Sequence, residues 1–172
     1  EIAGPALRKV VDYQDAAYGA LFLDRLEPVL ALDRQRGGQR LGWALSRETA
    51  RYLALWMTFE DVFRVADLKT RAARFDRVRD EVHAAPNQIV GISEFMHPRI
   101  EEVCDALPAG LGRYILSSPR LRGFLGRFFR SGRRIATTHL RGFILLYIVA
   151  WFGRYRRHSL RFKTETARIE NW

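Results

Sequence analysis

The sequence predicts an all-α protein, an irregular helical bundle with a central apolar helix and no significant sheet. Apolar residues recur at helical spacing along most of the 172 residues. No segment combines strong two-residue alternation with hairpin turn chemistry. An uncharged run at 142–153 supplies the apolar helix. Because 48% of the residues are hydrophobic, enough for a core, we expect residues 1–172 to form a single helical domain.

The N-terminal segment is predicted to be helical. Val10, Tyr13 and Ala17 begin a stripe at i, i+3 and i+7 that continues for two more turns. Pro28 is expected to kink or break this pattern, because proline has no backbone N–H to donate. A glycine pair then predicts an exposed loop over 34–42.

The longest helical pattern covers 46–83, with Ser46 as the expected N-cap. An unbroken helix of that length would span about 57 Å, which is long for one domain. We therefore expect a kink or restart near Thr58 and Asp61, which have the spacing of a capping motif. The apolar stripe that defines the pattern consists of Tyr52, Trp56, Phe59, Phe63 and Ala66.

Shorter helices are expected after a linker at 84–91, which contains both proline and glycine. Ser118 is predicted to cap a basic helix that has Pro119 at its first position. The predicted short helices cover 98–107, 113–116 and 120–130.

The run at 142–153 is predicted to be a buried core helix rather than a membrane span. A transmembrane helix needs roughly 20 apolar residues. Arg141 and Arg154 bound this run on both sides, so it is too short. The helical pattern then turns basic and continues to Ile169.

The net charge of +10 is unevenly distributed, because the chain from Arg113 onward has 14 of the 29 Lys and Arg but only two of the 19 acids. This asymmetry indicates an anionic partner surface. Phe124 and Phe128 are spaced as core residues of a helix, which favours arginines on a solvated rim. Binding of nucleic acid or of an anionic membrane surface remains the alternative. The candidate docking patch comprises Arg120, Arg127, Arg130, Arg133 and Arg134.

No catalytic, cofactor-binding or metal-binding residue is predicted in this chain. Cys104, the single cysteine, follows an apolar helix face and is expected to be a buried, inert thiol. The four histidines do not pair at i, i+3 or i+4, and phosphate-loop motifs are absent. Glu60, between Trp56 and Phe63 on the stripe, is expected to be partly buried in an ion pair.

Two stretches, 11–18 and 53–75, carry a resemblance to a known family. The first is VDYQDAAY, and the second begins LALWMTFEDV and continues RVADLKTRAARF after one residue. Together they resemble the C-terminal helical domain of the bacterial indolepyruvate oxidoreductase beta-subunit family, among the 2-oxoacid:ferredoxin oxidoreductases. The motif residues that carry over, without an assigned role, are Trp56, Glu60, Asp61, Asp67, Lys69, Arg71 and Arg74.

The resemblance implies a parent enzyme that oxidatively decarboxylates an aryl pyruvate such as indolepyruvate, with coenzyme A and ferredoxin as acceptors. Thiamine diphosphate, magnesium and iron–sulfur clusters would lie in other domains or subunits. The chain would then be a non-catalytic accessory domain, excised from a larger subunit, whose partners are the other domains or subunit and ferredoxin. Low cysteine content is typical of a cytoplasmic location.

Overall fold

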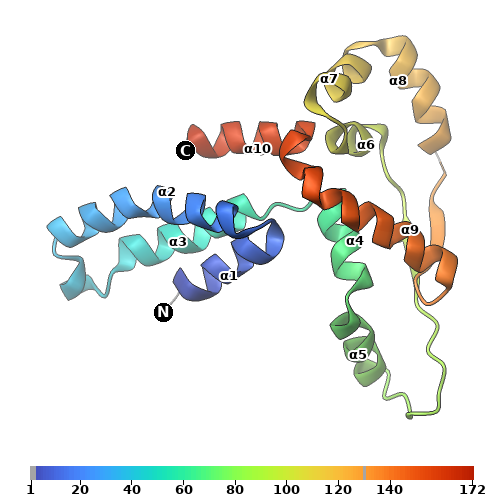
Figure 1. Cartoon of the computed structure of the whole chain (residues 1–172), viewed down its shortest axis with the longest axis horizontal. Helices are drawn as coiled ribbons and strands as arrows, with labels where there is room; N and C mark the ends of the chain where they lie inside the picture. Colours follow the sequence, from blue (N-terminus) through green and yellow to red (C-terminus); the bar gives the residue numbers. More distant parts are fainter. Residues whose placement is uncertain (1–2, 130) are drawn as a thin grey trace. The chain divides into compact units, whose positions relative to one another are not determined.

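The computed structural model describes residues 3–129 and 131–172 (Figure 1). The chain divides into two compact units. Unit 1 comprises residues up to Phe59 together with Thr164–Trp172, and unit 2 comprises Glu60–Lys163. Whether these two units fold as a single domain, as the sequence predicts, stays a prediction.

The prediction of an all-α fold with no significant sheet is confirmed. Within the described ranges the only sheet is one antiparallel pair of short strands, which aligns Ser93 with Ala136. The α-helices are α1 (Ala3–Tyr13), α2 (Ala16–Gln35), α3 (Ala44–Met57), α4 (Val62–Thr70), α5 (Ala72–Glu81), α6 (Ile100–Ala106), α7 (Ala109–Ser117), α8 (Pro119–Gly126), α9 (Leu140–Trp151) and α10 (Leu160–Glu170). The 3-10 helices are η1 (Gly38–Leu41), η2 (Arg127–Phe129) and η3 (Phe152–His158), and the strands are β1 (Ser93–Met96) and β2 (Arg133–Ala136).

Unit 1 is built on α1, α2 and α3, which pack against one another. The predicted stripe supplies only its first part to the core: Val10 and Tyr13 are buried, but Ala17 is exposed and Phe22, outside the stripe, is buried instead. Tyr18 is also buried, and its hydroxyl donates a 3.1 Å hydrogen bond to the carbonyl of Met57, the last residue of α3. The tyrosine thereby satisfies one of the carbonyls that a helix leaves unpaired at its C-terminus.

The junction between α2 and α3 differs from the prediction for Ser46. Helix α3 begins at Ala44, so Ser46 lies inside the first turn and is not the N-cap. Its backbone N–H and its hydroxyl both donate to a carboxylate oxygen of buried Asp33, at 2.9 and 2.7 Å. A buried carboxylate is tolerated where such donors compensate its lost hydration.

Pro28 does not break the helix, because α2 runs from Ala16 to Gln35 with Pro28 inside it, and the predicted kink at Pro28 stays a prediction. Asp15 is the N-cap of this helix and accepts a 2.8 Å hydrogen bond from the backbone N–H of Tyr18.

The predicted restart of the long helix is confirmed, although Asp61 rather than Thr58 caps the second segment. Thr58 is instead the C-cap of α3, and its hydroxyl donates to the carbonyl of Ala54 in the last turn of that helix. Asp61 has an extended backbone, and its carboxylate accepts a 2.7 Å hydrogen bond from the backbone N–H of Arg64 in α4.

Unit 2 has α4 packed against α9, with α6, α7 and α8 forming a helical group. Ser118 caps α8 and Pro119 occupies its first turn, as predicted, although the α-helix ends at Gly126. The backbone N–H of Leu160 donates to the carbonyl of Leu107, which fixes the start of α10 beside the loop between α6 and α7.

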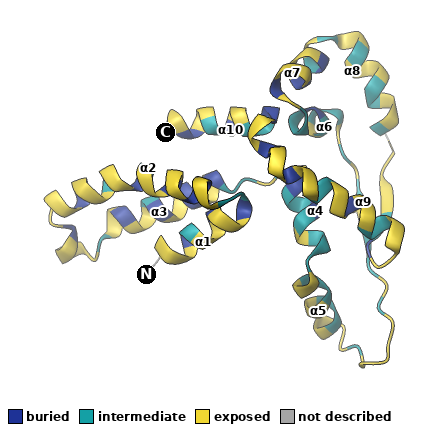
Figure 2. Cartoon of the chain, in the orientation of Figure 1, coloured by how far each residue is buried: buried dark blue, intermediate teal, exposed yellow. Residues whose placement is uncertain are grey.

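The helix predicted over 142–153 exists as α9, but its predicted burial is wrong in this chain. Leu146 is its only buried residue, and Figure 2 shows α9 mostly in the colour of exposed residues. The surface opposite α4 is covered by no other described part of unit 2 and displays Leu145, Ile148 and Trp151.

Candidate functional site

The centre of unit 2 contains a buried ion pair. The Nε of Arg156, in η3, donates to the Oδ2 of Asp61 at 2.6 Å, and the two side chains are 4% and 6% exposed. The guanidinium also lies over the ring of Phe63, 5.9 Å from its centroid. Asp61 therefore caps α4 and binds η3 at the same time.

A second ionic cluster lies along α4. Asp67 accepts from Arg64 at 3.0 Å and from Arg71 at 2.6 Å. These side chains are spaced three and four residues apart, so a helical surface alone brings them together.

A third cluster joins distant parts of the sequence. Glu94, in β1, pairs with both Lys69 of α4 and Arg74 of α5. The side chain of Glu94 is 14% exposed, so this carboxylate is held by two cations in a largely desolvated position. Such pairing offsets the cost of burying the charges.

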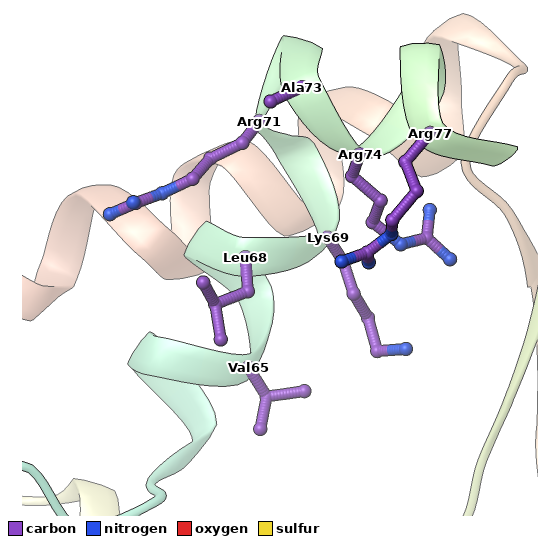
Figure 3. A pocket seen from close by; sticks show the side chains of 7 residues that line it. All are labelled: Val65, Leu68, Lys69, Arg71, Ala73, Arg74 and Arg77. Atoms are coloured by element: carbon purple, nitrogen blue, oxygen red, sulfur yellow. The ribbon is translucent and has the colours of Figure 1, made fainter. Parts of the chain in front are cut away.

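Three of the predicted motif residues line one pocket, shown in Figure 3. Lys69, Arg71 and Arg74 share its wall with Arg77, and the cavity has a volume of about 460 Å³. The rest of the lining is apolar and consists of Val65, Leu68 and Ala73. None of the lining residues is acidic, although Glu94 pairs with Lys69 and Arg74, and Asp67 pairs with Arg71.

The other motif residues are not in this pocket. Glu60 is exposed, so its predicted partial burial on the apolar stripe is wrong. Trp56 belongs to unit 1, where its indole stacks on Trp172 with ring centroids 6.1 Å apart. Asp61 serves the buried ion pair with Arg156.

The predicted basic docking patch is exposed where the structure describes it. Arg120 lies on α8, Arg127 on η2, and Arg133 and Arg134 on β2. Arg130 lies outside the described residues.

The aromatic residues beside this patch are exposed as well. Phe124 and Phe128 are 57% and 59% exposed and meet edge to face, so their predicted place in the core is wrong. They extend from the surface of α8 and η2 because no other described helix of unit 2 covers them.

Cys104 is fully buried in α6, as predicted. Burial raises the pKa of its thiol, and the neighbouring carboxylates of Asp105 and Glu101 raise this pKa further. A thiol with a raised pKa is a poor nucleophile at neutral pH. The pKa of Glu101 is lowered instead, by a hydrogen bond from its own backbone N–H and by one from the Arg122 guanidinium.

Metal and cluster ligands do not converge in residues 3–129 and 131–172. No three His, Cys, Asp or Glu side chains in these ranges are placed to hold a metal ion. The four histidines are exposed and Cys104 is the single cysteine, so the described residues do not fit magnesium or an iron–sulfur cluster. None of the helices described is both long enough and apolar enough to cross a membrane.

Two central residues were missed by the sequence analysis. Arg156 lies in a basic run that reads as a solvated face, and only its burial against Asp61 distinguishes it. The sequence contains only a weak indication that Glu94 is structurally important: it is the single acid between Ala84 and Ile100, and Phe95 and Met96 follow it.

Comparison with known proteins identifies a family but no characterised relative. A search of the curated proteins found no match, and a search of the solved structures found none. The profile of a family of unknown function, DUF6537, matches residues 1–172. The chain is therefore a member of the DUF6537 family over its whole length.

Proposed function

We propose that this chain is a non-catalytic helical accessory domain of an indolepyruvate, or related aryl-pyruvate, ferredoxin oxidoreductase subunit. The parent enzyme would oxidatively decarboxylate 2-oxoacids in the cytoplasm, with coenzyme A as acyl acceptor and ferredoxin as electron acceptor. The support is the resemblance of the 11–18 and 53–75 stretches, combined with a surface that fits packing against a larger protein.

The observation that carries the proposal is the outer face of α9 and η3. Helix α9 is apolar around its whole circumference, yet only one side of it packs on α4. A helix of this kind is normally buried on all sides. The outer face displays Leu145, Ile148, Trp151, Phe152 and Tyr155, which are between 43% and 53% exposed.

The occupant we propose for this face is another domain of the same oxidoreductase. A contiguous exposed apolar surface of this kind marks a protein interface. Arg141 and Arg154 flank the apolar residues, and the Arg154 guanidinium lies 4.1 Å from the centroid of the Trp151 ring. An acidic rim around an apolar patch would complement this arrangement.

The basic patch of Arg120, Arg127, Arg133 and Arg134 has a separate role in the proposal, which is to attract an acidic partner such as ferredoxin. Surface charges of this kind mainly raise the association rate and weaken in high salt. Charge reversal at Arg127 and Arg134 is expected to slow ferredoxin reduction at low salt.

The proposal is tested with the full-length polypeptide that contains this chain. We expect it to reduce ferredoxin when supplied with indolepyruvate and coenzyme A, and we expect the 172-residue chain alone to have no such activity. A full-length protein that reduces no acceptor with any aryl or aliphatic 2-oxoacid would contradict the proposal.

A second candidate function, binding of single-stranded nucleic acid, is favoured by Phe124 and Phe128. Exposed aromatic rings beside arginines are a stacking platform for bases. This reading predicts binding of a labelled oligonucleotide with an affinity that falls steeply with salt, and a loss of affinity in Phe124→Ala. If the chain is retained neither on heparin nor on single-stranded DNA, this second candidate function is contradicted.

A further inference from the structure

We infer that the pocket between α4 and α5 is a binding site for a small molecule carrying phosphate groups. This site is independent of the docking faces above and goes beyond the proposed function. Four cationic side chains and three apolar ones line it, and all come from residues 65–77.

The geometry gathers three of the cations on one side. Figure 3 shows the amine of Lys69 and the guanidinium groups of Arg74 and Arg77 extending to the same side of the helices, while Arg71 extends the other way. A phosphate group has three or more acceptor oxygens, which match several such donors at once.

Arg74 provides the strongest argument for a ligand. Its side chain is only 16% exposed, and its Nη2 pairs with Glu94. Its Nη1 is buried and has no hydrogen-bond partner among the described residues. An unsatisfied buried donor of a charged group is costly, so an acceptor oxygen from a bound ligand would stabilise it.

The charges around the pocket leave room for an anion. Glu94 is shared between Lys69 and Arg74, so one carboxylate faces two cations. Arg77 pairs with Glu81 at 3.7 Å, with both side chains well exposed, which makes this pair weak. Arg71 pairs with Asp67, so the four lining cations are matched by the three carboxylates of Glu94, Asp67 and Glu81, and the local balance stays positive by one charge.

The size and the apolar part of the lining set the class of ligand. A cavity of about 460 Å³ lies in the range of small-molecule sites. Val65 and Leu68 provide an apolar wall that inorganic phosphate alone would not use. A diphosphate attached to an organic body fits both features, whereas a free diphosphate uses only the cations.

Isothermal titration calorimetry with inorganic pyrophosphate, at fixed ionic strength, tests the site in the chain. We expect saturable binding at one site. Arg77→Gln is expected to weaken it about tenfold, because the variant loses the charge-assisted hydrogen bonds that the guanidinium would donate to the anion. Arg99→Gln, another exposed arginine of unit 2 that lies outside the pocket and outside the basic patch, is expected to bind like the unmodified chain.

Two further variants separate a ligand site from a purely structural cluster. Arg74→Lys keeps a cation beside Glu94 but removes the second donor, so pyrophosphate affinity is expected to fall several-fold while the helical circular dichroism signal persists. Glu94→Gln removes the competing carboxylate and is expected to tighten binding. If Arg74→Lys does not fold, Arg77→Gln decides the question, because its side chain is exposed and packs little.

The source of the diphosphate is distinguished by titrating ADP in parallel. Tighter binding of ADP than of pyrophosphate assigns the site to an organic diphosphate that contacts Val65 and Leu68. Equal binding assigns it to the free diphosphate. Absence of saturable binding by either probe, or affinities that Arg77→Gln leaves unchanged, would overturn the inference.

Discussion

Arg156 and Asp61, which are 95 residues apart in sequence, form an ion pair at 2.6 Å that is almost completely shielded from water. The pair joins η3 to the N-terminus of α4, where Asp61 is the N-cap. One carboxylate thereby does two structural tasks in unit 2. It caps α4, the helix that follows the break in the long helical pattern, and it neutralises the Arg156 guanidinium beside Phe63.

Replacing Arg156 by methionine is expected to destabilise unit 2 by about 3–5 kcal/mol, because it leaves the Asp61 carboxylate buried without its counter-charge. Urea denaturation followed by circular dichroism measures the change. The matched control is Arg154→Met, an exposed neighbour, which is expected to cost about 1 kcal/mol or less. Equal stability losses in the two variants would show that the buried pair does not hold the unit together.

Two helical glycines are expected to respond oppositely to alanine. A Cβ on Gly142, in α9, would lie 2.1 Å from the carbonyl oxygen of Ala136, so Gly142→Ala must displace the backbone and should lower the melting temperature. A Cβ on Gly123, in α8, would meet nothing within 4 Å. Gly123→Ala is expected to stabilise the helix by about 0.5–1 kcal/mol. A Gly142→Ala chain as stable as the original would refute the close approach.

Cys104 is expected to react with thiol reagents only when the chain opens. Its raised pKa means that the folded state favours the neutral thiol, so this contribution to stability is complete below the pKa of the unfolded thiol. The contribution is lost as pH rises through the folded pKa. We expect slow labelling at pH 8 and rapid labelling in denaturant, and stability that declines in the alkaline range more in the native chain than in Cys104→Ala. Fast stoichiometric labelling of the folded chain would contradict this.

The helices followed from local rules, and the contacts between them did not. The restart near Asp61 and the cap at Ser118 were predictable because capping depends on neighbouring residues. Asp33 with Ser46 and Asp61 with Arg156 were not, since a buried partner is chosen by tertiary packing. The partners are 13 and 95 residues apart in the sequence, so the spacing rules of a single helix do not pair them.

The run at 142–153 also shows that tertiary contacts could not be predicted from local sequence. Its composition indicated a helix surrounded by protein, and α9 is a helix covered on one side in this chain. Hydrophobicity predicts that a face is covered but not which polypeptide covers it. Lys69, Arg71 and Arg74 were likewise recognised from the sequence as one motif. The pocket that they line was not predicted, because it forms only where the chain turns between α4 and α5.

Cysteine labelling in the full-length polypeptide measures whether another domain of the parent protein covers the outer face of α9. Ile148→Cys places a thiol on that face, and Val82→Cys places one on an exposed position of unit 2 away from it. Peptide-level mass spectrometry measures the rate at which each thiol is alkylated. We expect the thiol of Ile148→Cys to react at least tenfold more slowly than that of Val82→Cys, on the order expected for a covered interface. Equal rates at the two positions would contradict it.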